Sequence, residues 1–164
     1  MRKVVEMSSN IAVILAVLVL GGLMVRDRIR SSPGPQLNVG DTIRPLAGQK
    51  WNEYGPTLLL ALRPGCPYCE KSMPFYRELA HREKDGRLTA RLLAVVSSDE
   101  AKAREYAASN RLAMTFHSNT DFSKIKIQGT PTLALIDRGG RVERVWVGKL
   151  TTEEEADLLR NIAR

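Results

Sequence analysis

The segment Arg63-Pro64-Gly65-Cys66-Pro67-Tyr68-Cys69-Glu70 decides the interpretation of this chain. It contains the only two cysteines of the 164 residues, and it follows the almost wholly apolar run 57–62. Such a run is typical of a strand that is buried on both faces of a sheet. Pro67 suits the first turn of a helix, where its missing backbone N–H has no partner to lose. We therefore expect the cysteines to lie between a buried strand and a helix.

Two thiols at this spacing predict redox chemistry. Cys66 would stand at the helix N-terminus, where free backbone amides and the helix dipole favour a thiolate. Cys69, one helical turn further along, would be less exposed and could reach back to Cys66. Cys66 is expected to attack a disulfide in a partner protein, and Cys69 to resolve the mixed disulfide. The same steps in reverse would oxidise a dithiol.

A metal site or a structural pair of cysteines is the alternative. A tetrahedral zinc site needs four ligands, whereas the chain has no second cysteine pair and only two histidines, His81 and His117. A C-x-x-C motif between a strand and a helix favours redox chemistry. We expect neither a metal nor a cofactor.

The N-terminal region contains a long apolar segment. Residues 7–25 carry no charge, and as a helix these 19 residues would be about 28 Å long, close to the roughly 30 Å hydrocarbon thickness of a bilayer. The segment has no polar face, and no A-x-A-like cleavage site follows it. The sequence predicts a membrane anchor within residues 1–30, a linker at 31–36 that contains prolines and glycine, and a globular domain over 37–164.

The charge pattern does not indicate a nucleic-acid binder. The formal net charge is +7, and the first 30 residues contribute +3 of it. The remaining charges are spread along the chain, without a basic stripe or an aromatic-basic motif, so no nucleic-acid partner is expected. The excess of positive charge near the N-terminus suits an interaction with lipid headgroups. Basic residues flank the apolar segment on both sides, so the positive-inside rule does not fix its orientation.

The remaining sequence predicts an α/β domain. Apolar runs at 90–96 and 132–136 indicate two more buried strands, and the turn signal at 137–140 leads to a returning strand at 142–147. The order β-α-β-α-β-β-α favours a largely parallel sheet with helices on both faces and an antiparallel hairpin at one edge. A helix is expected over 67–81, with a bend at Pro74. A second helix should run from the cap at Ser98-Asp99 to Ser109, and a third should follow a capping box formed by Thr151 and Glu154. Residues 115–121 are expected to be loop, and residues 122–127 a short turn.

At this point the chain resembles the thioredoxin superfamily, and within it the membrane-anchored TlpA-type thiol:disulfide proteins. The resemblance rests on the C-x-x-C motif after an apolar strand, on Met73-Pro74, on Gly129-Thr130-Pro131, and on the hairpin 136–140 followed by Val147-Gly148. It covers roughly residues 37–164. It implies a thioredoxin-like fold, with a mixed, mostly parallel central sheet flanked by helices.

The resemblance also implies roles for single residues. The Thr130–Pro131 bond would be cis and would pack beside the redox pair, and the backbone of Thr130 would pair with a bound substrate strand. Pro67 and Tyr68 would line the substrate approach. Without the resemblance, Pro131 could equally be an ordinary proline at the start of a strand.

The chain departs from the family pattern at several positions. Gly65 stands where the family usually has Trp, and Leu60 stands where many thioredoxins carry a buried acid that serves the second thiol. The Pro67-Tyr68 dipeptide is commoner in glutaredoxin-like proteins. Arg63 replaces the Thr or Ser that peroxiredoxins place three residues before their reactive cysteine, so a peroxidase is less expected.

The prediction is a single-pass thiol–disulfide oxidoreductase in the cytoplasmic membrane, with its domain on the outer side. Its partners would be proteins that carry disulfides or dithiols, a membrane thiol donor, and membrane lipid through the N-terminal helix. The resemblance implies a reductant in protein or cytochrome maturation. An oxidant in disulfide formation and a non-catalytic partner-binding module remain open, because sequence does not give the reduction potential.

Overall fold

The computed structural model describes residues 36–46, 49–53 and 55–164. The predicted anchor at 7–25 lies outside the described residues, as does the linker except for Gln36. The compact unit that contains the described residues is Pro35–Arg164. None of the described helices has the combined length and apolarity that a bilayer crossing requires.

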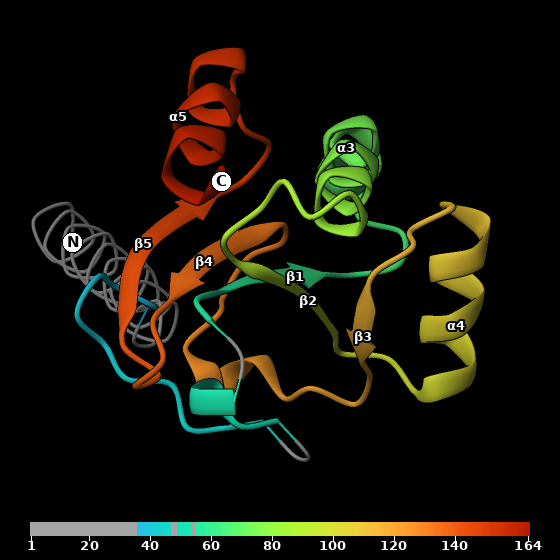
Figure 1. Ribbon diagram of the computed structural model, residues 1–164. Helices are drawn as coiled ribbons and strands as arrows, with labels where there is room; N and C mark the ends of the chain where they lie inside the picture. Colours follow the sequence, from blue (N-terminus) through green and yellow to red (C-terminus); the bar gives the residue numbers. More distant parts are fainter. Residues whose placement is uncertain (1–35, 47–48, 54) are drawn as a thin grey trace, which may run out of the picture. The chain divides into compact units, whose positions relative to one another are not determined.

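The described residues build a five-stranded sheet in the order β3-β2-β1-β4-β5 (Figure 1). All six residues of β1 are buried at its centre, as the continuous apolar sequence predicts. β1 runs parallel to β2, and β2 to β3, whereas β4 is antiparallel to both β1 and β5. The strands are β1 (Thr57–Leu62), β2 (Arg91–Val96), β3 (Thr115–His117), β4 (Thr132–Ile136) and β5 (Val142–Val147).

The helices begin where the sequence places capping residues. The Asp99 side chain accepts from the backbone of α4, and Thr151 and Glu154 form the predicted capping box of α5. The segments are η1 (Trp51–Glu53), α2 (Pro67–Lys71), α3 (Met73–Lys84), α4 (Glu100–Ser109), η2 (Phe122–Ile125) and α5 (Thr152–Ile162).

The prediction of one bent helix after Cys66 is wrong in detail. The helix breaks at Ser72 into α2 and α3, two residues before Pro74. A proline excludes the carbonyl four residues before it, here that of Glu70, and supplies no N–H to the ladder. The chain avoids this conflict by ending α2 at Lys71, so that Pro74 falls in the first turn of α3, where a proline is tolerated.

One prediction for the second half of the domain is also wrong. Residues 115–117, expected as loop, form the edge strand β3. The sheet is mixed as predicted: β1, β2, β3 and β5 run in one direction, and β4 alone runs in the other. The register aligns Thr132 with Ala61, Ala61 with Val95, and Val95 with His117. The chain therefore leaves β3 and enters β4 at the same end of the sheet, and β4 must run in the opposite direction.

The sheet has a core on each face. Side chains of α3 and α5 pack on one face together with alternate residues of β1, among them Leu60. The other face is covered by the segment around Ile43, by η1 and by η2. Figure 1 shows α3 and α5 on one side of the sheet and the short helices on the opposite side. The indole of Trp51 in η1 donates to the carbonyl of Ile43 at 2.8 Å, which ties the first segment to this second layer.

Candidate active site

Cys66 lies at the junction that the sequence predicts, between the buried strand β1 and the short helix α2. It is the N-cap residue of α2, and the backbone N–H of Cys69 donates to its sulfur at 3.2 Å. Gly65, which precedes it, has a φ of +72°. A side chain at that backbone conformation is strained, so the turn favours glycine where the family pattern has Trp.

Cys69 is fully buried one turn further along α2, on the core side of the helix. Both cysteines are free thiols, and their Sγ atoms are 2.6 Å apart. The thiol of Cys69 donates to the sulfur of Cys66. The two sulfurs are therefore placed for closure of an intramolecular disulfide.

The Gly129-Thr130-Pro131 segment covers the sulfur of Cys66. The Thr130–Pro131 peptide bond is cis, as the family resemblance implies. The thiol of Cys66 donates to the carbonyl oxygen of Thr130 at 3.2 Å. The N–H of Gly148, after β5, donates to the carbonyl of Pro131 at 2.8 Å and holds the segment to the sheet. The antiparallel pairing of β4 with β1 thus brings Thr130 to the cysteine.

Hydrogen bonds lower the pKa of Cys66 below its ordinary value. Burial, the largest single influence, acts in the opposite direction, but it is outweighed by hydrogen bonds from the thiol of Cys69, from the side chain of Thr130, and from the backbone amides of Cys69 and Tyr68. The thiolate of Cys66 is therefore easier to form than that of an ordinary cysteine, which is what an attacking thiol needs.

Cys69 is perturbed in the opposite direction. Burial, and then the hydrogen bond with Cys66, raise the pKa of Cys69 to about 12. The thiol of Cys69 therefore stays protonated at neutral pH while Cys66 is free to react. This division matches the predicted difference between an attacking and a resolving thiol.

Two expectations about Cys66 need correction. The residue is only 8% exposed, because the Thr130 segment lies over it, whereas the sequence suggested an exposed sulfur. The helix behind it has five residues, so the local amides of α2 stabilise the thiolate and the dipole of a long helix does not.

The other predicted site residues surround the cysteines at the surface. Pro67 is exposed in the first turn of α2, and Tyr68 is 60% exposed, so its ring is open to a partner. The Nζ of Lys71 lies 5.9 Å from the Tyr68 ring centroid, and the guanidinium carbon of Arg63 lies 5.9 Å from that of Phe122. Their substrate-binding roles remain predictions.

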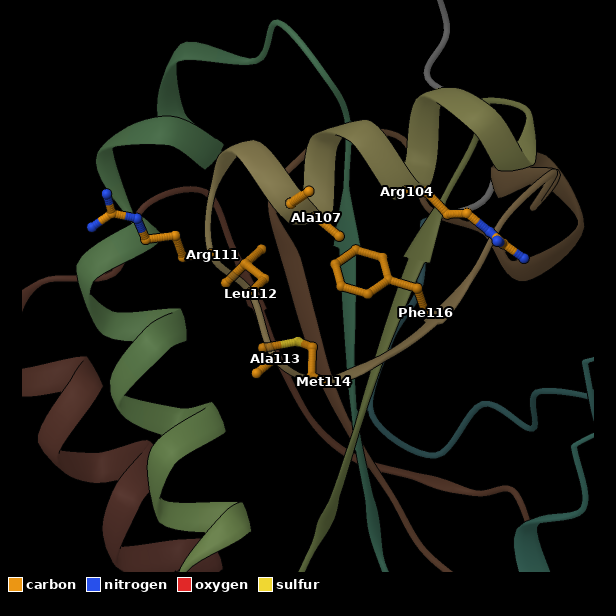
Figure 2. Close-up of a pocket in the computed structure, with 8 residues that line it drawn as sticks. Arg104, Ala107, Arg111, Leu112, Ala113, Met114 and Phe116 are labelled. Atoms are coloured by element: carbon orange, nitrogen blue, oxygen red, sulfur yellow. The ribbon is translucent and has the colours of Figure 1, made fainter.

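Within the described part of the chain, no group of three His, Cys, Asp or Glu side chains comes together that could hold a metal ion. A hollow of about 560 Å³ lies between α4 and β3, with Phe116, Leu112 and Met114 on its wall (Figure 2). None of the predicted site residues lines that hollow.

Two tyrosines share a core cluster with the cysteines, which the sequence did not predict. Tyr76 of α3 and Tyr106 of α4 belong to the same core cluster as Cys66 and Cys69. The helical spacing of α3 indicated that Tyr76 is a core residue, but not that it lies near the thiols. No signal in the sequence connects Tyr106 with cysteines that lie about forty residues earlier.

The fold and the site define a class of protein: a thioredoxin-like domain with a C-x-x-C dithiol at the start of a helix and a cis-proline segment against it. Residues 52–163 match the sequence profile of the thioredoxin-like domain family. The chain belongs to this family. A comparison with curated protein sequences found no match.

Several solved structures share the fold. A putative protein disulfide isomerase from Bacteroides thetaiotaomicron is 20% identical, with a TM-score of 0.62 over 79% of this chain and 91% of that one. A putative thiol:disulfide interchange protein DsbE from Chlorobium tepidum is 20% identical, with a TM-score of 0.59 over 76% and 95%. A putative thioredoxin from Neisseria meningitidis is 22% identical, with a TM-score of 0.57 over 74% and 86%. At these identities the likeness establishes the fold, with neighbours of the DsbE/TlpA type.

Proposed function

We propose that this protein is a thiol:disulfide oxidoreductase that exchanges its Cys66–Cys69 dithiol and disulfide with partner proteins. The observation that carries the proposal is the asymmetry of the pair. Cys66 lies at the edge of the core with a lowered pKa, while Cys69 is buried beside it with a pKa of about 12. Family membership and the class of the structural neighbours support the same activity.

The exchange proceeds in two steps. The Cys66 thiolate attacks one sulfur of a partner disulfide, which forms a Cys66–partner disulfide and releases the other partner sulfur as a thiolate that takes up a proton. Cys69 then loses its proton and attacks the sulfur of Cys66. The Cys66–Cys69 disulfide forms, and the partner leaves with both of its cysteines reduced. The enzyme returns to its dithiol by the reverse exchange with a thiol donor.

The cellular role that we propose is reduction in extracytoplasmic protein or cytochrome maturation. The resemblance to TlpA-type proteins and the DsbE-type structural neighbours support it. Residues 7–25 would anchor the chain in the lipid of the cytoplasmic membrane, with the domain outside. The anchor would raise the effective concentration of membrane-bound partners, including a membrane thiol donor. Membrane fractionation and protease accessibility of the domain in intact spheroplasts test this placement, and a full-length chain in the soluble fraction would contradict it.

The activity itself is tested with matched cysteine variants. The wild-type chain should reduce the disulfides of insulin in the presence of dithiothreitol, and C66S should not. C69S should accumulate a mixed disulfide with its partner, because the resolving thiol is missing, and mass spectrometry would identify that partner. Equal activity of wild type and C66S in insulin reduction would contradict the proposal. Survival of cellular function in C66S would favour a non-catalytic binding module.

One observation favours a second candidate, an oxidant in disulfide formation. Contacts that stabilise the Cys66 thiolate stabilise the reduced enzyme, and that raises the reduction potential. Equilibration of the Cys66–Cys69 pair with glutathione buffers separates the two directions. A potential near or below about −270 mV supports the reductant, and one near about −120 mV supports the oxidant.

A further inference from the structure

Another hollow opens next to the segment that carries Cys66. It measures about 290 Å³ and is lined by Pro64, Lys102, Glu105, Tyr106 and Ser109. Pro64 lies two residues before Cys66, and the other four residues belong to α4. Figure 1 shows that the chain leaves β1 on the side of the sheet where α4 lies. No residue of the Gly129-Thr130-Pro131 segment lines this hollow, so it is a separate part of the surface around the thiol.

One stripe of α4 forms the wall of the hollow. Its four lining residues are three or four positions apart along the helix, which places their side chains on the same face. Tyr106, in the middle of this stripe, is 7% exposed, and its hydroxyl oxygen is buried. The Tyr106 side chain therefore presents carbon to the hollow. Gly65, next to Pro64, has open space around it: a Cβ at that position would meet no other atom within 4 Å.

The rim of the hollow favours an uncharged occupant. Lys102 and Glu105 are both exposed and carry opposite charges. The ammonium of Lys102 lies 3.4 Å from the carboxylate of Asp99, so its charge is already paired. An acidic side chain would meet the carboxylate of Glu105, and a basic one would have to leave water for a surface of ring carbons. The methylene stems of Lys102 and Glu105 extend this apolar surface below their charged ends.

The hollow has the size and the position to take one side chain of a bound partner. Its volume of about 290 Å³ lies at the lower limit of the roughly 300–1,000 Å³ that small-molecule pockets occupy. The Cα atoms of Pro64 and Cys66 are at most about 7.6 Å apart, because two trans peptide units join them. An extended chain covers about 6.6 Å in two residues, and side chains two residues apart point to the same face. A partner cysteine that meets Cys66 therefore brings the side chain two residues away to the hollow.

We propose that the hollow between Pro64 and α4 is a specificity pocket, which takes an aliphatic side chain two residues from the partner cysteine that bonds to Cys66. The inference rests on the proposed function and adds to it a preference among partner proteins. The pocket takes no part in the bond exchange. It holds the partner chain while the Cys66 thiolate attacks the partner sulfur and the second sulfur of that disulfide leaves.

Two five-residue peptides test the pocket and the proposed function together. Each has a central cysteine in a mixed disulfide with thionitrobenzoate, and the two end residues are leucine in one peptide and glycine in the other. Thionitrobenzoate is the better leaving group, so its release in a stopped-flow spectrometer reports attack by Cys66 on the peptide sulfur. Free peptide thiol, measured by chromatography, reports resolution by Cys69. The wild-type chain should attack the leucine peptide about tenfold faster than the glycine peptide.

Variants of α4 locate the preference. Ser109→Trp fills the hollow and should reduce the ratio of the two rates to less than about threefold. Ser109→Glu adds a second carboxylate to the rim and should also reduce the ratio, and it decides the matter if the Trp variant does not fold. Ala108→Trp is the matched control, because it places the same indole one residue earlier, in the wall of the hollow between α4 and β3. It should keep the tenfold preference.

The possible outcomes separate the inference from the function. Equal rates with the two peptides in the wild-type chain, or a preference that survives in the Ser109 variants, would overturn the pocket. An equal loss of preference in Ala108→Trp would overturn it as well, because the effect would then not belong to this hollow. A wild-type chain that releases no free peptide thiol from either peptide would instead overturn the proposed function.

Discussion

Variants that keep only one of the two cysteines test why the two thiols should differ in reactivity. In C69S only Cys66 can be alkylated, and in C66S only Cys69 can. The C69S substitution keeps the backbone N–H at position 69, so an amide donor to the Cys66 sulfur is retained. Burial, the largest cause of the raised pKa of Cys69, remains in C66S. We expect iodoacetamide to modify Cys66 much faster than Cys69 near neutral pH.

The size of the difference follows from the pKa values. With a pKa of about 12, roughly one Cys69 in 10⁵ is a thiolate at pH 7. At the reference pKa of 9.0, roughly one thiol in 10² is ionised at pH 7. The pKa of Cys66 is lower than this, so a larger fraction of Cys66 is thiolate. A more basic thiolate is intrinsically more nucleophilic, and this offsets about half of the difference between the logarithms of the two thiolate fractions. These wild-type values give about a 30-fold difference in rate, and loss of the Cys66–Cys69 hydrogen bond in the two variants reduces it.

Mass spectrometry of samples quenched at successive times gives both rates. The same two variants in concentrated urea provide the control, where the thiols should react at similar rates. Native rates within about threefold of each other would refute the argument that burial of one thiol and amide contacts to the other set their roles.

Three further predictions concern stability. Thr151→Ala removes the capping box of α5 and should lower the free energy of unfolding by about 1 kcal/mol in urea titrations. Gly140→Ala should cost about 3 kcal/mol or more in the same assay, because φ is +84° and a new Cβ would lie 2.7 Å from the Trp51 ring. Glu83 accepts a hydrogen bond from the backbone N–H of Leu92, and burial raises the pKa of its carboxyl. The protonated carboxyl therefore stabilises the fold fully below the unfolded pKa of 4.5, and this stabilisation is lost as the pH rises through the pKa in the folded state. Glu83→Gln should therefore raise the melting temperature at pH 7, and the gain should disappear toward pH 4.

Each stability prediction has a matched control. Thr152→Ala changes an exposed threonine that does not cap α5, and a loss as large as that of the capping variant would contradict the capping argument. Gly86→Ala introduces the same kind of backbone strain, at φ +69°, into open space, so it should cost less than Gly140→Ala. Glu143→Gln, on the exposed side of β5, should show no pH-dependent gain in melting temperature.

Continuous apolar runs made the central strands predictable from the sequence. The predicted strands at 57–62, 132–136 and 142–147 match β1, β4 and β5, and the second strand differs by one residue at its start. The edge strand β3 was missed because it has only three residues, one exposed and two half-buried, and pairs on one side only. Such a strand has no periodicity of its own and depends on β2 for its conformation.

The site was predictable where it is local in sequence. The spacing of Cys66 and Cys69 predicted two thiols one turn apart, which the structure bears out. The contact with Thr130 came only through the family resemblance, because it depends on the direction of β4. Tyr106 could not be predicted at all, since the packing of α4 against the core decides its neighbours.

The contact between Cys66 and Thr130 joins segments that are 64 residues apart. The pairing of β1 with β4 creates it, and pairings between distant segments close late because a long stretch of chain must first be ordered. A chain still emerging from the ribosome therefore carries its C-x-x-C motif before the segment that covers it has been made. Until β4 is in place, the Thr130 carbonyl cannot accept from the thiol of Cys66. Completion of the sheet therefore covers this sulfur, because the Thr130 carbonyl reaches Cys66 only when β4 is paired with β1.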